Sequence, residues 1–375
     1  ETLLPLVDKS VKAGKSKKAI FQLFSLGVVT NRDEWVYDNN TDDLISKVEF
    51  LIDVYSKDLA KHKGKEKKEI KDLIDYSIKW TRAVKNDIAK GKEYIIDASL
   101  IIDCLYRPFH KKHLYYNKEL NEMRYQMPYI FPETKESNLL IAVNQSTKPF
   151  NILASKYLVD LHFNGDSNCI PLYRYDKDGN RQDNITDWGQ NQFTKQYKTK
   201  KITKEDIFHY VYAVLHYPAY RAKYELNLKR EFPRIPFYED FKKWAAWGRA
   251  LMELHINYES VTPYPLKEIT KAANESPKAK LKANKVAGTI EIDENITITG
   301  VPVEVWEYKL GNRSAIEWIL DQYKEGKPKD PTIAEKFNTY RFADYKEQVI
   351  DLLKRVCTVS VETMKIINEM NDTKE

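Results

Sequence analysis

Residues 203–218 read TKEDIFHYVYAVLHYP, and at this stretch the chain turns from strand-like segments back to helix. Thr203 and Asp206 have the spacing of a capping box, in which each side chain bonds a free backbone N–H at a helix start. Pro218 limits the stretch, because a residue that precedes proline disfavours helical backbone. The pattern predicts a helix that ends near Tyr217, with His209 and His216 at core or boundary positions.

The sequence before this helix changes character twice. Apolar residues repeat at helical spacing between Thr41 and Leu59 and predict an amphipathic helix, and residues 70–90 predict a second one. Residues 94–175 hold short apolar runs separated by Pro, Asn and Gly, which predict strands joined by loops.

After residue 218 helices dominate again. Residues 238–258 and 344–370 predict helices, and a capping box starts a third at Ser314. Residues 262–285 are rich in Pro, Ala and Lys and predict a loop or linker, whereas residues 288–310, including Val303–Tyr308, predict strands.

The order of these segments predicts a mixed α+β fold, because the strands are grouped and do not alternate strictly with helices. We expect a helical lobe over 1–92, a β-rich lobe over 93–202, and a helix-rich lobe over 203–375 with a β insertion near 286–310.

Composition narrows the function classes. The chain has 375 residues, 12 of them glycine, and a net charge of +6. Few glycines argue against a nucleotide-binding domain, and the mild positive charge permits a polyanionic partner. Three widely spaced Cys, no signal peptide and no apolar run of membrane-spanning length predict a cytoplasmic protein without a membrane partner. The start at Glu1 without Met suggests a piece of something longer.

Catalytic motifs are weak. Gly14-Lys15-Ser16 supplies half of a phosphate loop, but Lys9 stands where the first glycine is needed. The Asn/Asp-Pro-Pro-aromatic loop of amino-methyltransferases is absent, and two histidines, His110 and His113, are a poor zinc signal.

One enzymatic alternative stays open. Asp293, Glu307 and Lys309 have the spacing of a Mg²⁺-dependent nuclease, in which two acids hold the metal and a lysine stabilises charge on the scissile phosphate. The pattern is loose in a chain with 31% charged residues. The competing interpretation is a polar strand edge whose Val305 and Trp306 pack inside.

Basic and aromatic residues interleave more persistently, in residues 106–116, 124–126 and 220–224. Arg and Lys neutralise phosphates, and Arg, Asn and Gln can read base edges through paired hydrogen bonds. These clusters, on a basic chain without a catalytic motif, indicate DNA binding. A protein-docking module has no positive support in the sequence.

Several strings occur in the order found in one known family and together cover about residues 20–365. This ordered set resembles the C-terminal specificity region of type ISP restriction-modification enzymes of bacteria. The strings are GVVTNRD at 27–33 with Trp35 and Tyr37, YRPF at 106–109, Pro128 to Pro132, IPLY at 170–173, residues 207–221, FPRIP at 232–236, and residues 305–318.

The resemblance implies that the chain is the target recognition domain of a single polypeptide that also carries a nuclease, a helicase-like ATPase and an adenine methyltransferase. It implies double-stranded DNA and the upstream methyltransferase domain as partners. S-adenosylmethionine, ATP and Mg²⁺ would serve the parent polypeptide, with no cofactor and no catalysis in this piece. In this family the nuclease lies at the opposite end of the polypeptide, so the resemblance makes a nuclease site at Asp293, Glu307 and Lys309 less favoured.

Within this resemblance we expect DNA contacts from basic or amide side chains in loops and basic–aromatic stretches. For each of these side chains the alternative interpretation is that it stabilises the fold and does not contact DNA. Arg32, for example, could pair with Asp33 or Glu34. Base-reading residues should differ between specificities and so lie outside the shared strings. The expected contacts are Lys15, Lys17, Lys18, Asn31, Arg32, Arg107, Lys111, Lys112, Arg124, Lys148 and Arg313.

Overall fold

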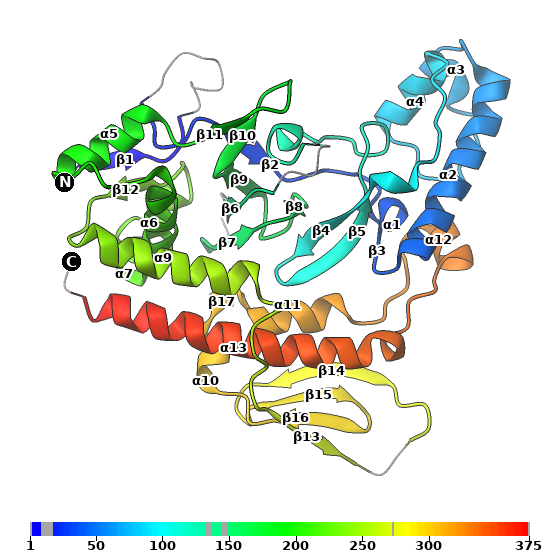
Figure 1. Cartoon of the computed structure of the whole chain (residues 1–375). Coiled ribbons are helices and arrows are strands. Elements are labelled where there is room, and N and C mark those ends of the chain that lie inside the picture. The colour runs from blue at the N-terminus through cyan, green and yellow to red at the C-terminus, as the bar shows by residue number, and fades with distance from the viewer. Residues whose placement is uncertain (1, 9–17, 133–136, 145–148, 272–273, 374–375) are drawn as a thin grey trace.

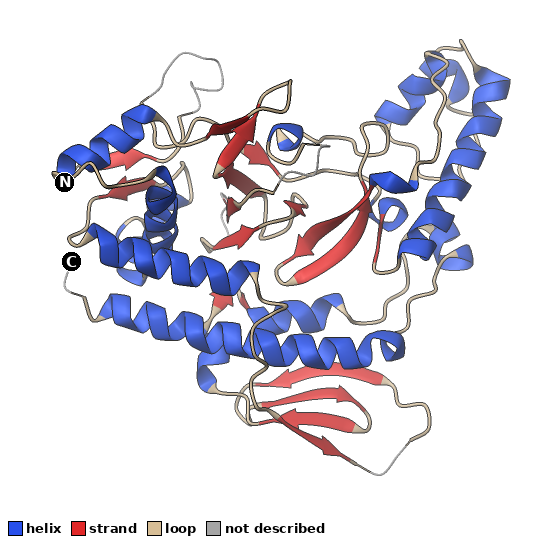
Figure 2. Cartoon of the chain, in the orientation of Figure 1, coloured by secondary structure: helices blue, strands red, loops and turns tan. Residues whose placement is uncertain are grey.

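The computed structural model of the chain describes residues 2–8, 18–132, 137–144, 149–271 and 274–373. Helices and several small sheets make up this structure, so the predicted mixed α+β class is confirmed (Figure 2). None of the helices in these ranges has the length and apolar content needed to cross a membrane.

The helix predicted after Thr41 is α2 (Thr41–His62), which follows the short α1 (Asp33–Val36). Asn40 begins α2, because its side chain accepts two backbone N–H groups of the first turn. One side of α2 is buried, through Leu44, Val48 and Leu51 among others. The apolar period therefore predicted both the helix and the side that packs.

The helix predicted over residues 70–90 is wrong in part, because only α4 (Arg82–Ala89) is helical within the segment. The short α3 (Lys67–Ile70) comes before it, with turns between the two helices. The backbone N–H of Asp75 donates to the Asp58 carboxylate, and the indole N–H of Trp80 donates to the carbonyl oxygen of Asp75. Such side-chain bonds compete with helical backbone bonds and interrupt the helix.

Two four-stranded sheets fill the middle of the molecule (Figure 1). They confirm most of the strands predicted within residues 94–175, but the apolar run at 94–96, also expected as a strand, is not one. Each sheet also takes a short strand from the first forty residues. One sheet has the order β3 (Tyr37–Asp38), β5 (His110–Tyr115), β4 (Ile101–Arg107), β8 (Leu158–Val159). The other has the order β2 (Ser25–Leu26), β9 (Ser167–Pro171), β6 (Leu140–Asn144), β7 (Ile152–Ser155).

The sheet that contains β6 is buried on both faces. Side chains alternate across a strand, so Leu140 and Ala142 enter one hydrophobic cluster whereas Ile141 and Val143 enter the other. This double burial explains why β6 is apolar at successive positions.

Helix α6 (Lys204–His216) matches the prediction, including the reciprocal capping bonds between Thr203 and Asp206. It packs against α9 (Phe241–Ile256), and Gly248 lies at the crossing. A Cβ on Gly248 would lie 1.7 Å from the carbonyl oxygen of His209, so only glycine permits this approach. His209 and His216 are both buried, as predicted. The neighbouring helices are α5 (Asp187–Gln196), α7 (Pro218–Lys223) and α8 (Glu225–Leu228).

The expected linker at residues 262–285 is wrong in part, because it contains strands β13 (Lys267–Thr270) and β14 (Ala279–Asn284). They flank β15 (Thr289–Asp293) and β16 (Ile296–Thr299) in a sheet of order β13-β16-β15-β14. The β insertion therefore extends over 267–299, not 286–310. Its exposed edge strands carry lysines and few apolar residues, so the sequence there lacks the apolar pattern that indicates a strand.

The strand predicted at Val303–Tyr308 is also wrong, since residues Val303–Glu307 form helix α10. Pro302 precedes this helix, and the burial of Val305 and Trp306 gives it an inner side. The remaining elements are β17 (Lys309–Leu310), β18 (Arg313–Ser314), α11 (Ala315–Gln322), α12 (Pro331–Lys336) and α13 (Lys346–Asn371). Helix α13 lies beside α9 and passes above the β13–β16 sheet in Figure 1.

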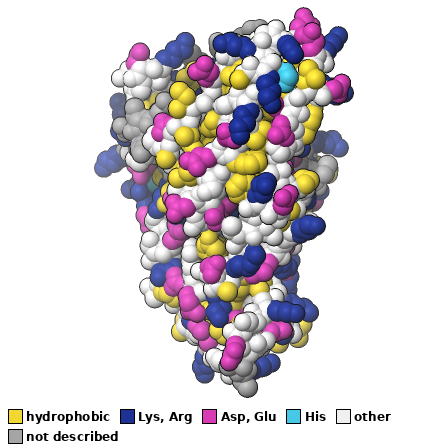
Figure 3. Space-filling view, turned by 90° about the vertical axis from the view of Figure 1, so that its right-hand side faces the viewer, with side chains coloured by type: hydrophobic (Ala, Val, Ile, Leu, Met, Phe, Trp, Pro, Cys, Tyr) yellow, Lys and Arg dark blue, Asp and Glu magenta, His cyan; other side chains and the backbone are white. Residues whose placement is uncertain are grey.

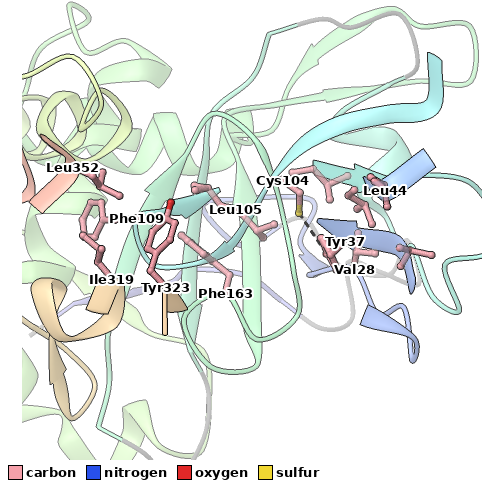
Figure 4. Close-up of a cluster of buried hydrophobic side chains, with 14 of the residues drawn as sticks. Val28, Tyr37, Leu44, Cys104, Leu105, Phe109, Phe163, Ile319, Tyr323 and Leu352 are labelled. Atoms are coloured by element: carbon pink, nitrogen blue, oxygen red, sulfur yellow. Dashed lines mark hydrogen bonds between the residues drawn. The ribbon is translucent and has the colours of Figure 1, made fainter. Parts of the chain in front are cut away.

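Residues from all three ranges expected as lobes share one hydrophobic cluster. Leu44, Leu105 and Leu352 belong to it, and Figure 4 shows it extending from the N-terminal segments through β4 to α11 and α13. Strand β1 (Leu3–Pro5) likewise pairs with β12 (Arg234–Pro236), far along the chain. These long-range contacts join the first and last parts of the chain into one packed structure.

Candidate nucleic-acid interface

Three chain segments lie side by side near β2 and β8 and form a small surface that we call the loop platform, residues 28–31, 122–126 and 160–166. The backbone N–H of Val28 donates to Val159, and Leu161 donates back to Val28, both at 2.9 Å. On the other side, Val29 and Met123 exchange two backbone bonds of 2.9 Å. These bonds bring together residues that lie more than ninety positions apart in the sequence.

The platform exposes both hydrogen-bonding and apolar side chains. Asn31 is exposed, and His162 is exposed with its Nδ1 3.2 Å from Oδ1 of Asp166. Met123 and Tyr125 are large apolar residues with 46% and 37% of their surface exposed. Amide and imidazole groups can bond base edges, and apolar groups can contact thymine methyl groups.

The backbone of the platform is held in an uncommon conformation. Asn31, Tyr125 and Asp166 have φ values of 55°, 48° and 45°, in the left-handed region. A non-glycine residue there costs about 1–3 kcal/mol and persists only where its surroundings enforce it. Gly27 permits the close approach of two platform segments, because a Cβ on it would lie 2.4 Å from the carbonyl oxygen of Asp160.

A buried polar cluster supports the platform from below. The Asp160 carboxylate accepts hydrogen bonds from Arg107 at 2.8 Å, from the Tyr37 hydroxyl at 3.2 Å and from the backbone N–H of His162 at 2.8 Å. Burial raises the pKa of Asp160, and the Arg107 guanidinium opposes this by favouring the charged carboxylate. The cluster therefore fixes the loop that presents His162.

Arg107 and Arg32, both expected as DNA contacts, lie inside the protein. The Arg107 guanidinium stacks 4.0 Å from the centre of the Tyr106 ring and its side chain is 17% exposed. Arg32 is 4% exposed, and its guanidinium donates to the Thr81 hydroxyl. Burial lowers the pKa of Arg32 to about 10. In this conformation both residues hold the fold.

The basic–aromatic stretch at 106–113 also turns inward. It forms the tip of the β4–β5 hairpin, where Phe109 packs against Tyr258 of the segment after α9. Lys111 lies 3.3 Å from carboxylates of Asp103 and Glu259. Burial lowers the pKa of Lys112 to about 8, and its ammonium lies over the Tyr106 ring.

The other expected contacts are dispersed. Arg124 lies on the platform with its guanidinium 5.3 Å from the centre of the Tyr116 ring, and Lys18 is exposed. Arg313 pairs with Asp321 at 2.8 Å and lies over Trp318, in the C-terminal part. Lys15, Lys17 and Lys148 lie outside the described residues. The structure thus brings two expected residues, Asn31 and Arg124, together on the platform.

A two-stranded ribbon of β10 (Tyr173–Tyr175) and β11 (Arg181–Asp183) projects at the top of Figure 1. Arg181 is exposed and lies 4.4 Å above the Tyr173 ring. The Asn138 side chain connects the ribbon to Ile130, four residues beyond the platform segment 122–126, by donating to the carbonyl oxygens of Ile130 and Tyr173 at 2.9 and 2.8 Å. A β-ribbon of this kind has the width to enter a major groove.

Met123, Tyr125, His162 and the ribbon's Arg181 are not among the DNA contacts expected from the sequence. Of these four, only Tyr125 lies in one of the basic–aromatic stretches, residues 124–126. The turn signal at 176–180 marked the ribbon tip, and it was the available clue to Arg181.

The nuclease alternative has no support in the structure. Asp293 is 3% exposed, pairs with Lys346 at 3.3 Å and accepts two backbone N–H groups. Glu307 ends helix α10 and Lys309 lies in β17, so the strand frame of the motif is missing. In the part of the chain that the structure describes, three or more His, Cys, Asp or Glu side chains nowhere gather into a potential metal site.

The charge distribution on the side of the molecule next to α2 and α12 does not indicate a nucleic-acid-binding surface. Figure 3 shows Lys and Arg interleaved with Asp and Glu across that face, with apolar side chains between them. A nucleic-acid footprint is a patch or stripe of one sign. This face therefore lacks such a signature.

Comparison with known proteins finds one matching family and several similar solved structures. A family model described as the Type ISP C-terminal specificity domain matches residues 19–352. A cryo-EM structure of a DrdV–DNA complex is similar, with 47% identity, a TM-score of 0.94, and coverage of 100% of this chain and 38% of that chain. Comparison with curated proteins gives no match.

Two further solved structures are similar. A nuclease-deletion mutant of the Type ISP restriction-modification enzyme LlaGI, in complex with a DNA substrate mimic, has 32% identity and a TM-score of 0.83, covering 98% of this chain and 34% of that chain. The ATP-dependent Type ISP enzyme LlaBIII bound to DNA has 28% identity and a TM-score of 0.84, covering 98% and 24%. The chain thus spans about a quarter to two fifths of these proteins. It belongs to the Type ISP C-terminal specificity domain family.

Proposed function

We propose that the chain binds duplex DNA and recognises a specific sequence for a single-chain restriction-modification enzyme. The loop platform carries this proposal, because it fixes Asn31 and His162 on a backbone held by hydrogen bonds on both sides. Preorganised donors and acceptors discriminate between bases, since they do not need to be ordered on binding. That the similar structures of DrdV, LlaGI and LlaBIII are DNA complexes supports the same ligand.

Cations on the platform and on the ribbon supply affinity in this proposal. Arg124, which is half-buried on the platform, and Arg181, which is exposed on the ribbon, would contact phosphates. Such contacts release condensed counterions, so binding should weaken steeply with salt.

The remaining activities belong to other parts of the parent polypeptide in this proposal. The chain positions an adenine for N6 methylation by an upstream methyltransferase domain and controls ATP-dependent cleavage elsewhere. S-adenosylmethionine, ATP and Mg²⁺ would bind those domains, and this chain would not itself be an enzyme. The enzyme would act in the cytoplasm, which agrees with the free, buried thiols of Cys104, Cys169 and Cys357.

Fluorescence anisotropy with a randomised duplex pool tests the proposal, followed by selection and sequencing of the bound fraction. We expect binding that falls steeply between 50 and 200 mM salt, by about 10³-fold or more for six or more phosphate contacts, with one enriched motif. Asn31→Gly removes the side chain and keeps the left-handed backbone, and it should relax the motif at one position. Equal binding to all sequences would refute sequence recognition.

A further inference from the structure

Two exposed apolar side chains sit on the platform loop, next to its hydrogen-bonding groups. Met123 is 46% and Tyr125 is 37% exposed, and Arg124 stands between them. Met123 pairs through its backbone with Val29, and the side chain of Val29 is itself only partly buried. Water solvates such groups poorly, so their exposure on a rigid surface suggests an apolar ligand surface.

The loop that carries them is held at several points. Besides the Val29–Met123 pair, the backbone N–H of Gln126 donates to the Ser25 hydroxyl at 3.0 Å. The backbone N–H of Met127 then donates to the carbonyl oxygen of Arg124 at 3.0 Å, and a 3₁₀ turn (Met127–Tyr129) follows. These contacts enforce the left-handed backbone of Tyr125 and fix the direction in which the two side chains leave the loop.

We propose that Met123 and Tyr125 form a wedge that enters one base-pair step of the bound duplex. This rests on the proposed function, because it assumes that the platform faces DNA. Inserted apolar side chains unstack a step and kink the duplex, and aromatic rings stack on base faces. The thioether of Met123 adapts to irregular apolar gaps, and Arg124 stands where it can neutralise the phosphate next to the opened step.

The wedge predicts a form of sequence preference that needs no hydrogen bond to a base. Pyrimidine–purine steps unstack more readily than other steps, so the wedge should favour one of them at a fixed position in the target. Asn31 and His162 would read base edges on the flanking pairs. The platform would then combine direct and indirect readout.

A 2-aminopurine scan tests the wedge. This base analogue fluoresces when it is unstacked, and it is placed in turn at each position of the selected duplex. With the wild-type chain at saturation, we expect fluorescence to rise at one step only. A scan without any such rise, on duplex shown by anisotropy to be fully bound, would overturn the wedge and leave DNA recognition standing.

Variants then assign the effect. The double variant Met123→Ala/Tyr125→Gly keeps a backbone suited to position 125 and should abolish the rise, with about tenfold weaker binding. Tyr125→Phe should retain the rise, because stacking needs the ring and not the hydroxyl. Tyr76→Ala removes an exposed tyrosine from the segment between α3 and α4 and is the matched control.

Each result has one meaning. A rise that persists at full height in the double variant would refute the wedge, even if affinity falls. Absence of any binding by the wild-type chain at 20 mM salt would refute the proposed function and the wedge with it.

Discussion

Gly248→Ala is a sharp test of the helix crossing at the centre of this fold. The new methyl carbon would lie 1.7 Å from the carbonyl oxygen of His209 and 2.5 Å from its carbonyl carbon, against an ordinary contact of about 3.5–4.0 Å. Both obstacles are backbone atoms of α6, which cannot rotate away as a side chain would. Helix α6 must therefore move by more than 1 Å, and its aromatic neighbours must move with it.

The magnitude follows from two opposed effects. Replacing glycine by alanine inside a helix favours folding by about 1 kcal/mol through backbone entropy. Overpacking of a close-packed core opposes it by about 1–3 kcal/mol, and a backbone clash this severe lies at the upper end. We expect a net loss of about 2 kcal/mol of unfolding free energy.

Urea unfolding followed by far-UV circular dichroism measures this loss. Ala246→Gly is the control, because Ala246 is exposed on the same helix and its replacement should cost about 1 kcal/mol by propensity alone. If the crossing were looser than described, Gly248→Ala would be stabilising by a similar amount. An unchanged or higher urea midpoint for Gly248→Ala would thus refute the packing argument.

Three other predictions concern His255 in the buried part of α9, the ion pair beneath the platform, and the ribbon. Burial lowers the pKa of His255 to about 3, so the unfolded chain binds more protons and stability should fall as pH decreases from about 6.5 towards 3; His255→Gln should lose less stability than wild type between pH 7 and pH 5, measured by urea midpoints. Arg107→Ala leaves the buried Asp160 carboxylate unpaired and should lower the unfolding free energy by about 3–5 kcal/mol, whereas a change under 1 kcal/mol would show that the pair does not support the platform. Arg181→Ala should reduce the slope of log affinity against log salt by about 0.9, and Arg341→Ala, an exposed arginine between α12 and α13, should leave that slope unchanged.

Local patterns predicted the helices well where packing and capping agree. Helices α2 and α6 show this, since each has a capping side chain and an apolar surface that the core covers. The prediction failed where tertiary contacts override the local signal. Edge strands β13 and β14 are stabilised by pairing with the inner strands, and α10 has an inner side only because Val305 and Trp306 meet the core.

The candidate site was predictable only in part. Asn31 and Arg124 were expected from a polar turn and a basic–aromatic string, and both lie on the platform. Arg107 belongs to a denser basic string, yet it points inward because the buried Asp160 carboxylate needs a cation. Composition alone cannot separate a cation that serves the core from one that serves a ligand.

The amino-acid sequence by itself determined the fold class, the main helices and the family, because capping residues, apolar periods and ordered strings act through near neighbours in the chain. Only the tertiary structure decided which residues share a surface. Backbone bonds between Val28, Val29, Met123 and Leu161 bring three distant loops together. Pairing of this kind depends on the whole packed fold, since no segment of the platform carries a local signal for its partners.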